Sequence, residues 1–225
     1  MKDTFLLDID DTLLDFCRLE REQLLAVLRA FGERADDGIA ARFHAINDAL
    51  WKALERGEIT RERLVVQRFE TLKEAFGLRT RADALAVCFL DAMRSHAYLF
   101  DGAQAFLTEL SRRGRLFAVT NGASRVQRRH MEDTGILAYF EDVFISEEVG
   151  HQKPSPEYVS YVASHIPAFV PARTLYVGDS LTSDMVCAKC LGVDFILFRP
   201  DGAPAEWTGL CATDYAQILT LADGM

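Results

Sequence analysis

The sequence has no long hydrophobic run. Although 49% of its 225 residues are hydrophobic, no stretch approaches the roughly 18 consecutive apolar residues that a membrane-spanning helix needs. The first residues, MKDTFLLDID, also lack the basic flank, apolar core and small-residue cleavage site of a secretory signal. We therefore expect a cytoplasmic protein that buries a substantial core.

The sequence has fewer positively charged than negatively charged residues. The chain has 25 Lys and Arg residues against 34 Asp and Glu residues, which gives a formal net charge of −9. Because the backbone of a nucleic acid attracts clustered Lys and Arg, this balance argues against a nucleic-acid polymer as a partner. A small anionic substrate would then need a local positive site. The five cysteines are an odd number without framework spacing, which predicts reduced thiols.

An acidic motif follows the first apolar run. Residues 5–7 (FLL) predict a buried parallel strand, and Asp8 stands at its carboxyl end, followed by Asp10 and Asp11. Open parallel sheets bind ligands beyond these ends. Carboxylates this close repel one another unless a cation or hydrogen-bond donors offset them, and Mg²⁺ suits carboxylates, water and phosphate. The motif therefore indicates a metal-dependent phosphate site, the alternative being an exposed turn or helix cap.

The rest of the chain falls into two patterns. From about residue 18 to residue 99, apolar residues recur at helical spacing and glycines stand where helices would end, which predicts four helices. From Asp101 onward, short apolar runs alternate with helical segments, as in a doubly wound parallel sheet. The expected strands span residues 5–7, 116–120, 143–146, 174–177 and 195–198, and the helices between and after them span residues 106–113, 125–134, 156–164, 183–191 and 215–221.

Four motifs carry a family resemblance. DIDDT, at residues 8–12, resembles the nucleophile motif of the haloacid dehalogenase (HAD) superfamily, whose phosphatases carry Asp-x-Asp-x-Thr after the first strand. The other three family motifs follow in order: Thr120 in FAVTNG, Lys153 in GHQKPSPE, and Asp179 with Asp184 in YVGDSLTSD. Because four motifs at suitable spacing are far more specific than one, the resemblance extends over nearly the whole core.

The predicted fold class is α/β, with a doubly wound parallel-sheet (Rossmann-like) core and an inserted α-helical cap. The core is expected to comprise residues 1–16 and 97–225, and the cap residues 17–96. Four helices are too many for an ordinary strand-to-strand crossover. We therefore interpret them as a cap over the mouth of the site, as in the smaller capped members of the superfamily.

The resemblance implies roles for the first motif. Asp8 resembles the nucleophile that attacks phosphorus and forms an aspartyl phosphate. Asp10 would protonate the leaving oxygen and then activate the water that cleaves the intermediate. The family's dehalogenases lack an acid at this position, since halide leaves without a proton, so Asp10 favours a phosphatase. Asp11 is either a local hydrogen-bond acceptor or a direct participant.

The second and third motifs are expected to bind phosphate. The turn formed by Thr120, Asn121 and Gly122 would hold phosphoryl oxygens through its hydroxyl and backbone N–H groups, and Lys153 would place a positive charge against phosphate and Asp8. On its own, a Lys before Pro is typical of a surface loop. Its position between a strand and a helix favours the functional interpretation.

The implied cofactor is Mg²⁺. Asp179 resembles the metal-binding acid of the fourth motif, and Asp184 is a second ligand, bound either directly or through the outer shell. Asp8 and the backbone carbonyl of Asp10 would complete the protein's share of the octahedral shell.

The cap segment suggests a substrate. Residues 50–69, LWKALERGEITRERLVVQRF, are similar to the cap of the house-cleaning pyrimidine 5′-nucleotidases of the superfamily. This similarity implies hydrolysis of nucleoside 5′-monophosphates, with pyrimidines preferred. Trp51, Arg68 and Phe69 are candidates to stack on or bind the base, although aromatic residues at helical spacing are also typical of a core. Phe16 is a candidate for lining the entrance.

Other functions stay open on the same motifs. One is a phosphatase of another small metabolite, such as a sugar phosphate or phosphoglycolate. Another is a phosphosugar mutase, although the family's mutases typically have Gly where this chain has Asp11. A third, from a different class, is a phospho-acceptor signalling module, which needs neither a second acid nor a helical cap. A monomer or a weak dimer is expected, and the sequence does not decide between them.

Overall fold

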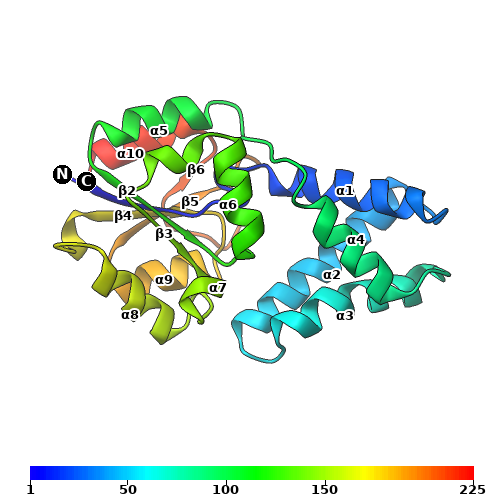
Figure 1. Cartoon of the computed structure of the whole chain (residues 1–225). Coiled ribbons are helices and arrows are strands. Elements are labelled where there is room, and N and C mark those ends of the chain that lie inside the picture. Colours follow the sequence, from blue (N-terminus) through cyan, green and yellow to red (C-terminus); the bar gives the residue numbers. More distant parts are fainter. The chain divides into compact units, whose positions relative to one another are not determined.

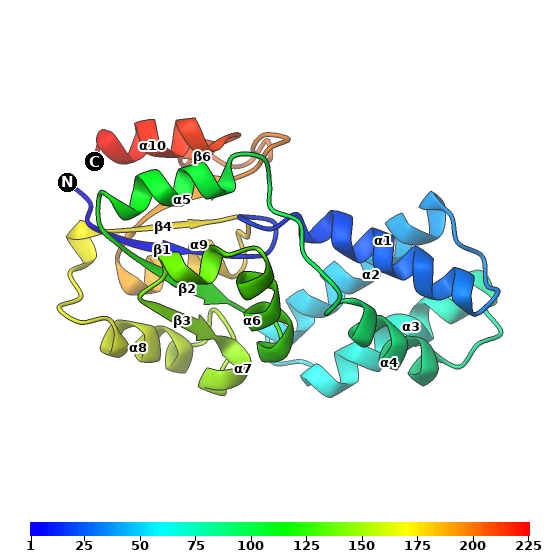
Figure 2. The ribbon, with the colours of Figure 1, turned by 45° about the horizontal axis from the view of Figure 1, so that its top comes forward.

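A computed structural model describes all 225 residues, which form two compact units. The sheet unit comprises Met1–Asp15 and Leu99–Met225, and the helical unit comprises Phe16–Tyr98. Figures 1 and 2 show the two units. None of the helices combines the length and the apolar composition needed to cross a bilayer.

The sheet unit contains one sheet of six strands in the order β3-β2-β1-β4-β5-β6, and every neighbouring pair is parallel. The predicted α/β fold with a doubly wound parallel sheet is thereby confirmed. The sixth strand was not predicted, because two residues are too few to give a periodic pattern. The strands are β1 (Thr4–Leu7), β2 (Arg115–Thr120), β3 (Asp142–Ile145), β4 (Thr174–Gly178), β5 (Asp194–Phe198) and β6 (Cys211–Ala212).

Helices cover both faces of this sheet. α5 and α10 lie against one face, and α8 and α9 against the other (Figures 1 and 2). The third strand ends one residue earlier than expected, because Ser146 already begins the short helix α7. The helices are α5 (Ala103–Ser111), α6 (Ser124–Asp133), α7 (Ser146–Val149), α8 (Pro156–His165), α9 (Asp184–Leu191) and α10 (Tyr215–Asp223), with 3₁₀ turns at Ile136–Tyr139 and Pro171–Arg173.

The central strand β1 places the acidic motif. It pairs in register with β2 on one side and β4 on the other, so that Leu7 lies opposite both Ala118 and Val177. The Asp8 N–H continues this pairing by donating to the Val177 carbonyl at 2.9 Å. Since the neighbours of β1 lead to opposite halves of the sheet, its carboxyl end is a topological switch point, where α/β sheets bind ligands. Thr120, the last residue of β2, belongs to the same edge.

The helical unit has four helices, as the apolar spacing predicts. Its core is centred on three aromatic rings, Phe43, Phe69 and Phe89, whose centroids lie 5.0 to 5.5 Å apart. All three side chains are 1% exposed or less. The helices are α1 (Phe16–Ala30), α2 (Asp37–Glu55), α3 (Arg61–Phe76) and α4 (Ala82–Ala92).

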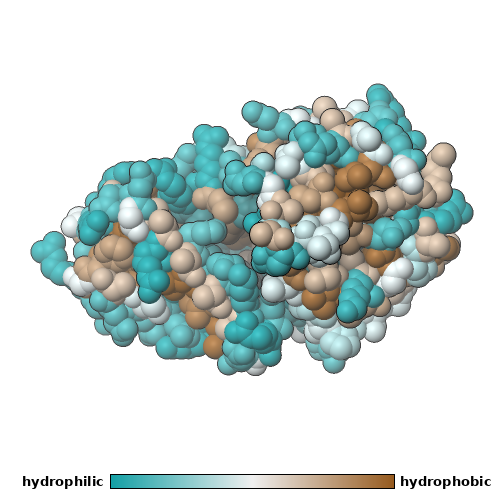
Figure 3. Space-filling view, turned by 180° about the vertical axis from the view of Figure 1, so that it is seen from behind, coloured by the Kyte–Doolittle hydropathy of each residue, from teal (hydrophilic) through white to brown (hydrophobic).

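The surface is mixed. The face in Figure 3 carries hydrophilic residues over much of its area, with hydrophobic residues in separate patches. Large exposed hydrophobic side chains, such as Phe31 and Val87 in the helical unit, are few. Scattered apolar residues of this kind are normal on a folded protein and do not mark a binding surface by themselves.

Truncating the aromatic centre of the helical unit tests this packing. We expect Phe69→Ala to lower the free energy of unfolding by about 3–5 kcal/mol, because the substitution removes a fully buried ring and leaves a cavity. Urea denaturation followed by circular dichroism measures the loss. Val87→Ala in α4, where the side chain is 68% exposed, is the control. A loss below about 1 kcal/mol for Phe69→Ala would contradict the described core.

Candidate active site

Asp8 is buried and held from two sides. Its carboxylate accepts a hydrogen bond from Lys153 Nζ at 2.6 Å on Oδ1 and from Thr12 Oγ1 at 3.1 Å on Oδ2. Thr12 reaches back because the chain turns tightly after β1, with the N–H groups of Leu13 and Leu14 both donating to the Ile9 carbonyl. The side chain therefore has a fixed orientation at the end of β1.

Lys153 supplies a buried positive charge. Its side chain is 2% exposed, and its ammonium donates to Asp8, to Asp184 Oδ1 at 2.7 Å and to the Val119 carbonyl at 2.9 Å. Burial alone lowers the pKa of Lys153, but the carboxylates of Asp184 and Asp8 outweigh it and raise that pKa above its usual value. Lys153 is thus a charged residue of the site, and the surface-loop alternative is wrong.

Asp184, at the start of α9, has protein partners on both oxygens. Oδ1 accepts from Lys153 and from the Tyr176 hydroxyl at 2.9 Å, and Oδ2 accepts from the Ser180 N–H at 3.0 Å. A Cβ on Gly178 would overlap this carboxylate, so the site requires glycine there. These bonds fix the orientation of the Asp184 carboxylate, and its binding to metal, directly or through the outer shell, stays a prediction.

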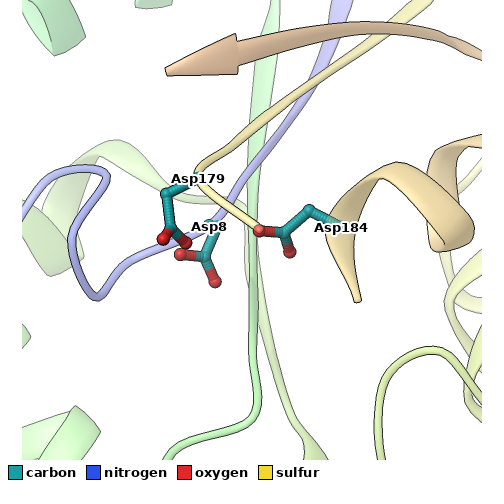
Figure 4. A group of neighbouring side chains, drawn as sticks. All are labelled: Asp8, Asp179 and Asp184. Carbon is teal, nitrogen blue, oxygen red and sulfur yellow. The ribbon is translucent and has the colours of Figure 1, made fainter. Parts of the chain in front are cut away.

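Three carboxylates converge at this edge of the sheet. Asp8, Asp179 and Asp184 come from the ends of β1 and β4 and the start of α9 (Figure 4), and one oxygen of each lies within 4.8 Å of the others. Asp179 has a weak cationic neighbour, the Arg199 guanidinium, 3.8 Å away. The Asp10 carboxylate is not in this group, so the metal role of Asp10 still rests on its backbone carbonyl as a prediction.

Negative charge exceeds positive charge in this cluster. Burial and the charge of Asp184 raise the pKa of Asp8 to about 7, against the lowering effect of Lys153. Burial together with Asp8 and Asp184 also raises the pKa of Asp179 well above its usual value. Oxygen donors carrying uncompensated charge are suited to a hard divalent cation, so these residues fit the Mg²⁺ that the sequence motifs imply.

The turn after β2 has internal hydrogen bonds. The Gly122 N–H donates to Thr120 Oγ1 at 3.1 Å, and phosphate binding by Gly122 stays a prediction. The Thr120 hydroxyl accepts this bond and keeps its own hydrogen for another acceptor. The Asn121 side chain is bound to the backbone of Lys153, accepting from its N–H at 2.7 Å and donating to its carbonyl at 3.0 Å. Asn121 therefore positions Lys153, and phosphate binding by its backbone stays a prediction.

Asp10 has a partner that sequence reasoning missed. Gln127, in the first turns of α6, donates from Nε2 to Asp10 Oδ2 at 2.6 Å, while Asp10 Oδ1 is buried without a partner. Burial and the charges of Asp8 and Asp11 raise the pKa of Asp10 well above its usual value. Gln127 stands 117 residues from Asp10 in sequence, and an isolated glutamine carries no motif.

Two candidate substrate residues lie inside the helical unit. Phe69 is completely buried against Phe43 and Phe89, so it has no face on which a base can stack and its predicted role is wrong. Arg68 is 5% exposed and donates from Nη1 to Asn47 Oδ1 at 3.2 Å, with its guanidinium 4.8 Å from the Phe89 ring. Burial lowers the pKa of Arg68 to about 10. Arg68 is therefore a core residue, and its predicted substrate contact is also wrong.

The other two candidates are only partly buried. Trp51 lies in α2, and the Arg61 guanidinium lies 5.2 Å from the centre of its ring. Phe16 begins α1 and packs against the core of the helical unit. Both keep exposed surface, so their substrate contacts stay predictions.

The comparisons with known proteins agree with this site. A family model of haloacid dehalogenase-like hydrolases matches residues 2–192. This chain belongs to that family. YfnB of Bacillus subtilis, a HAD-hydrolase, is 35% identical over 201 residues, which cover 89% of this chain and 86% of YfnB. A crystal structure of YfnB bound to magnesium matches this HAD hydrolase with a TM-score of 0.91 at 31% identity, covering 99% of each chain.

Two further relatives are pyrimidine 5′-nucleotidases. PynA of Streptococcus pneumoniae is 33% identical over 196 residues, covering 87% of this HAD hydrolase and 83% of PynA. YjjG of Escherichia coli is 28% identical over 223 residues, covering 96% and 97% of the two chains. The similarity in both cases includes the helical unit as well as the sheet unit.

Removing one carboxylate tests the charge imbalance. Because the raised pKa values of Asp8 and Asp179 mean that the folded state binds more protons than the unfolded state, the stability of the metal-free enzyme should fall as pH rises from about 4 to about 7. Asp179→Asn should flatten this fall and raise the melting temperature at pH 8 by about 2–4 °C, the shift expected for about 1 kcal/mol in a chain of this size.

Differential scanning fluorimetry in EDTA, and again with Mg²⁺, measures both effects. Mg²⁺ should stabilise the wild-type enzyme and should stabilise Asp179→Asn much less. The exposed Asp201 provides the matched control, Asp201→Asn. Two results would contradict this description of the cluster. One is a lower melting temperature of Asp179→Asn than of wild type at pH 8 in EDTA, and the other is an increase of its melting temperature with Mg²⁺ as large as that of wild type.

Proposed function

We propose that this HAD hydrolase is a Mg²⁺-dependent phosphomonoester hydrolase that acts through an aspartyl phosphate on Asp8. The observation that carries the proposal is the pairing of two different carboxyl groups at one strand end. Asp8 is clamped by the buried ammonium of Lys153, whereas Asp10 has no cation within hydrogen-bond distance and keeps one oxygen unpartnered. The two environments suit a nucleophile and a proton donor respectively.

In the first step, an Asp8 oxygen bonds to phosphorus and the bond from phosphorus to the leaving oxygen breaks. Asp10 donates a proton from Oδ1 to that oxygen, so an alcohol departs. In the second step, a water oxygen attacks the same phosphorus while Asp10 accepts its proton. The bond between phosphorus and the Asp8 oxygen then breaks, which releases phosphate and regenerates both side chains.

Three other residues serve the phosphoryl group. Lys153 offsets its charge and keeps the Asp8 carboxylate in place, and the Thr120 hydroxyl donates to a phosphoryl oxygen. Asn121 holds the backbone of Lys153 through its pair of hydrogen bonds. Removing any of these groups would reduce the stabilisation of the transition state more than it reduces the binding of the substrate.

The carboxylates of Asp8 and Asp179 and the backbone carbonyl of Asp10 would hold Mg²⁺, with Asp184 bound either directly or through the outer shell. When bound, the ion supplies positive charge against the phosphoryl oxygens. The protein's part is to keep the carboxylates in place. Lys153 donates to Asp8 and to Asp184, and the Tyr176 hydroxyl and the Ser180 N–H fix Asp184 beside them.

The helical unit is proposed to act as the cap that selects the substrate. The residues described in the sheet unit act on the phosphoryl group, which all phosphomonoesters share, so discrimination must come from contacts elsewhere on the substrate. Trp51 and Phe16 are the proposed contributors, because both keep exposed surface.

The proposed substrates are pyrimidine nucleoside 5′-monophosphates. The proposal is supported by the similarity to PynA and YjjG, which extends along most of each chain. Sugar phosphates and phosphoglycolate are the competing substrates, and a phosphosugar mutase is a competing reaction on the same motifs. The phospho-acceptor module is set aside, because the chain belongs to a hydrolase family.

A substrate panel tests the proposal at two levels. Purified enzyme with Mg²⁺ should release phosphate from p-nitrophenyl phosphate and lose that activity in EDTA. Among nucleotides, sugar phosphates and phosphoglycolate, kcat/KM should be highest for pyrimidine nucleoside 5′-monophosphates, by about tenfold or more, a preference worth about 1.4 kcal/mol. Trp51→Ala should reduce this preference and leave p-nitrophenyl phosphate hydrolysis nearly unchanged.

The possible results separate the two levels. If no phosphomonoester is hydrolysed with Mg²⁺ present, the phosphatase assignment fails. If phosphate is released but a sugar phosphate or phosphoglycolate gives the highest kcat/KM, only the nucleotidase assignment fails.

A further inference from the structure

Gln127 occupies an unusual position for a glutamine. Its side chain is 1% exposed, yet only one half of its amide is satisfied, because Nε2 donates to Asp10 and Oε1 is buried without a partner. Burying an amide with an orphaned oxygen costs stability. An apolar side chain of similar size would avoid that cost, so stability of the core does not explain this residue.

The contact itself is short and specific. Nε2 lies 2.6 Å from Asp10 Oδ2, a distance typical of a hydrogen bond to a charged or strongly polarised acceptor. The other carboxyl oxygen, Oδ1, is buried and has no protein partner. The amide therefore fixes the rotation of the carboxyl group and leaves Oδ1 without a protein partner.

The backbone around Gln127 is anchored at the same edge of the sheet. Its N–H donates to the Ala123 carbonyl at 2.9 Å in the first turn of α6, which directly follows the β2 turn. The preceding Ser124 N–H is capped by the Glu147 carboxylate at 2.7 Å. The amide is thus presented by a fixed helix terminus rather than by a mobile loop.

Gly122 provides the space for the amide. A Cβ at this position would overlap the Gln127 side chain, including Nε2. The Gly122 N–H donates to Thr120 Oγ1, and the missing side chain of Gly122 leaves space for Gln127.

We propose that Gln127 is a positioning residue for the proton-transfer step, holding the Asp10 carboxyl group so that Oδ1 faces the leaving oxygen and the attacking water. This inference rests on the proposed function, since it assigns Gln127 a part in the phosphatase reaction through Asp10. Gln127 itself contacts neither the phosphoryl group nor the nucleophile in this assignment.

The dependence on the leaving group distinguishes positioning from a structural role. An alkyl alkoxide needs a proton to depart, whereas p-nitrophenolate leaves without one, so only the alkyl ester depends strongly on the position of Asp10. Gln127→Met keeps a similar side-chain length and removes the N–H donor. It should lower kcat/KM about tenfold or more for an alkyl phosphate and less than about threefold for p-nitrophenyl phosphate, a part of the roughly 10²–10⁴-fold that acid–base catalysis supplies.

Four further variants complete the experiment. Gly122→Ala displaces the Gln127 amide without replacing Gln127. It should likewise lower kcat/KM more for the alkyl phosphate than for p-nitrophenyl phosphate. Asp10→Asn should show it more strongly, and adding Gln127→Met to Asp10→Asn should cause little further loss, because the group that Gln127 positions is already inactive. Arg129→Ala on the exposed side of α6, where Arg129 pairs with Asp133, is the control and should match wild type on both esters.

The outcomes distinguish the inference from the proposed function. If Asp10→Asn shows the selective loss but Gln127→Met and Gly122→Ala lose both esters equally, in step with a lower melting temperature, Gln127 is structural and only the inference is overturned. The inference is also overturned if the kcat/KM losses of Asp10→Asn and Gln127→Met multiply in the variant that carries both substitutions. If Asp10→Asn itself loses both esters equally, or wild type hydrolyses neither, the proposed function fails and the inference fails with it.

Discussion

The three hydrogen bonds of the buried Lys153 ammonium are the interaction on which the site depends. They join the nucleophile candidate Asp8, the carboxylate of Asp184 and the Val119 carbonyl of a neighbouring strand. Without this cation, three carboxylates with oxygens within 4.8 Å of one another would repel strongly in a buried setting. Even with it, the pKa values of Asp8 and Asp179 are raised, so the arrangement retains an excess of negative charge that a divalent cation would relieve.

The parallel sheet makes this arrangement possible with residues that lie far apart in the chain. Asp8 and Lys153 are 145 positions apart. They meet because Asp8 follows β1, Lys153 follows β3 and α7, and the parallel strands β1 to β4 have their carboxyl ends at one edge. Each of the strands β1, β2 and β4 continues into a turn that contributes one polar group. The helices that follow these turns then provide the outer contacts, Gln127 from α6 and Asp184 from α9.

The sequence predicted the parallel sheet, and it predicted the polar residues that directly follow strands, because Asp8, Thr120 and Asp179 each end an apolar run. It did not predict Gln127, since the partner of a buried amide is decided by folding and not by local spacing. The error at Phe69 has a related cause: an aromatic residue at helical spacing looks the same whether it faces a substrate or a core, and here it faces Phe43 and Phe89. For Gly122 the sequence indicated a tight turn, but the need for space beside Gln127 appears only in three dimensions.

Direct trapping of the intermediate on Asp8 is the most direct test of the central claim. The enzyme would be quenched during steady-state turnover of p-nitrophenyl phosphate and reduced with borohydride, which converts an acyl phosphate into the corresponding alcohol. Peptide mapping by mass spectrometry should then find homoserine in place of Asp8, and should find none without substrate or in Asp8→Asn. Turnover with an unmodified Asp8, or with the reduced residue at another position, would contradict covalent catalysis by this carboxylate.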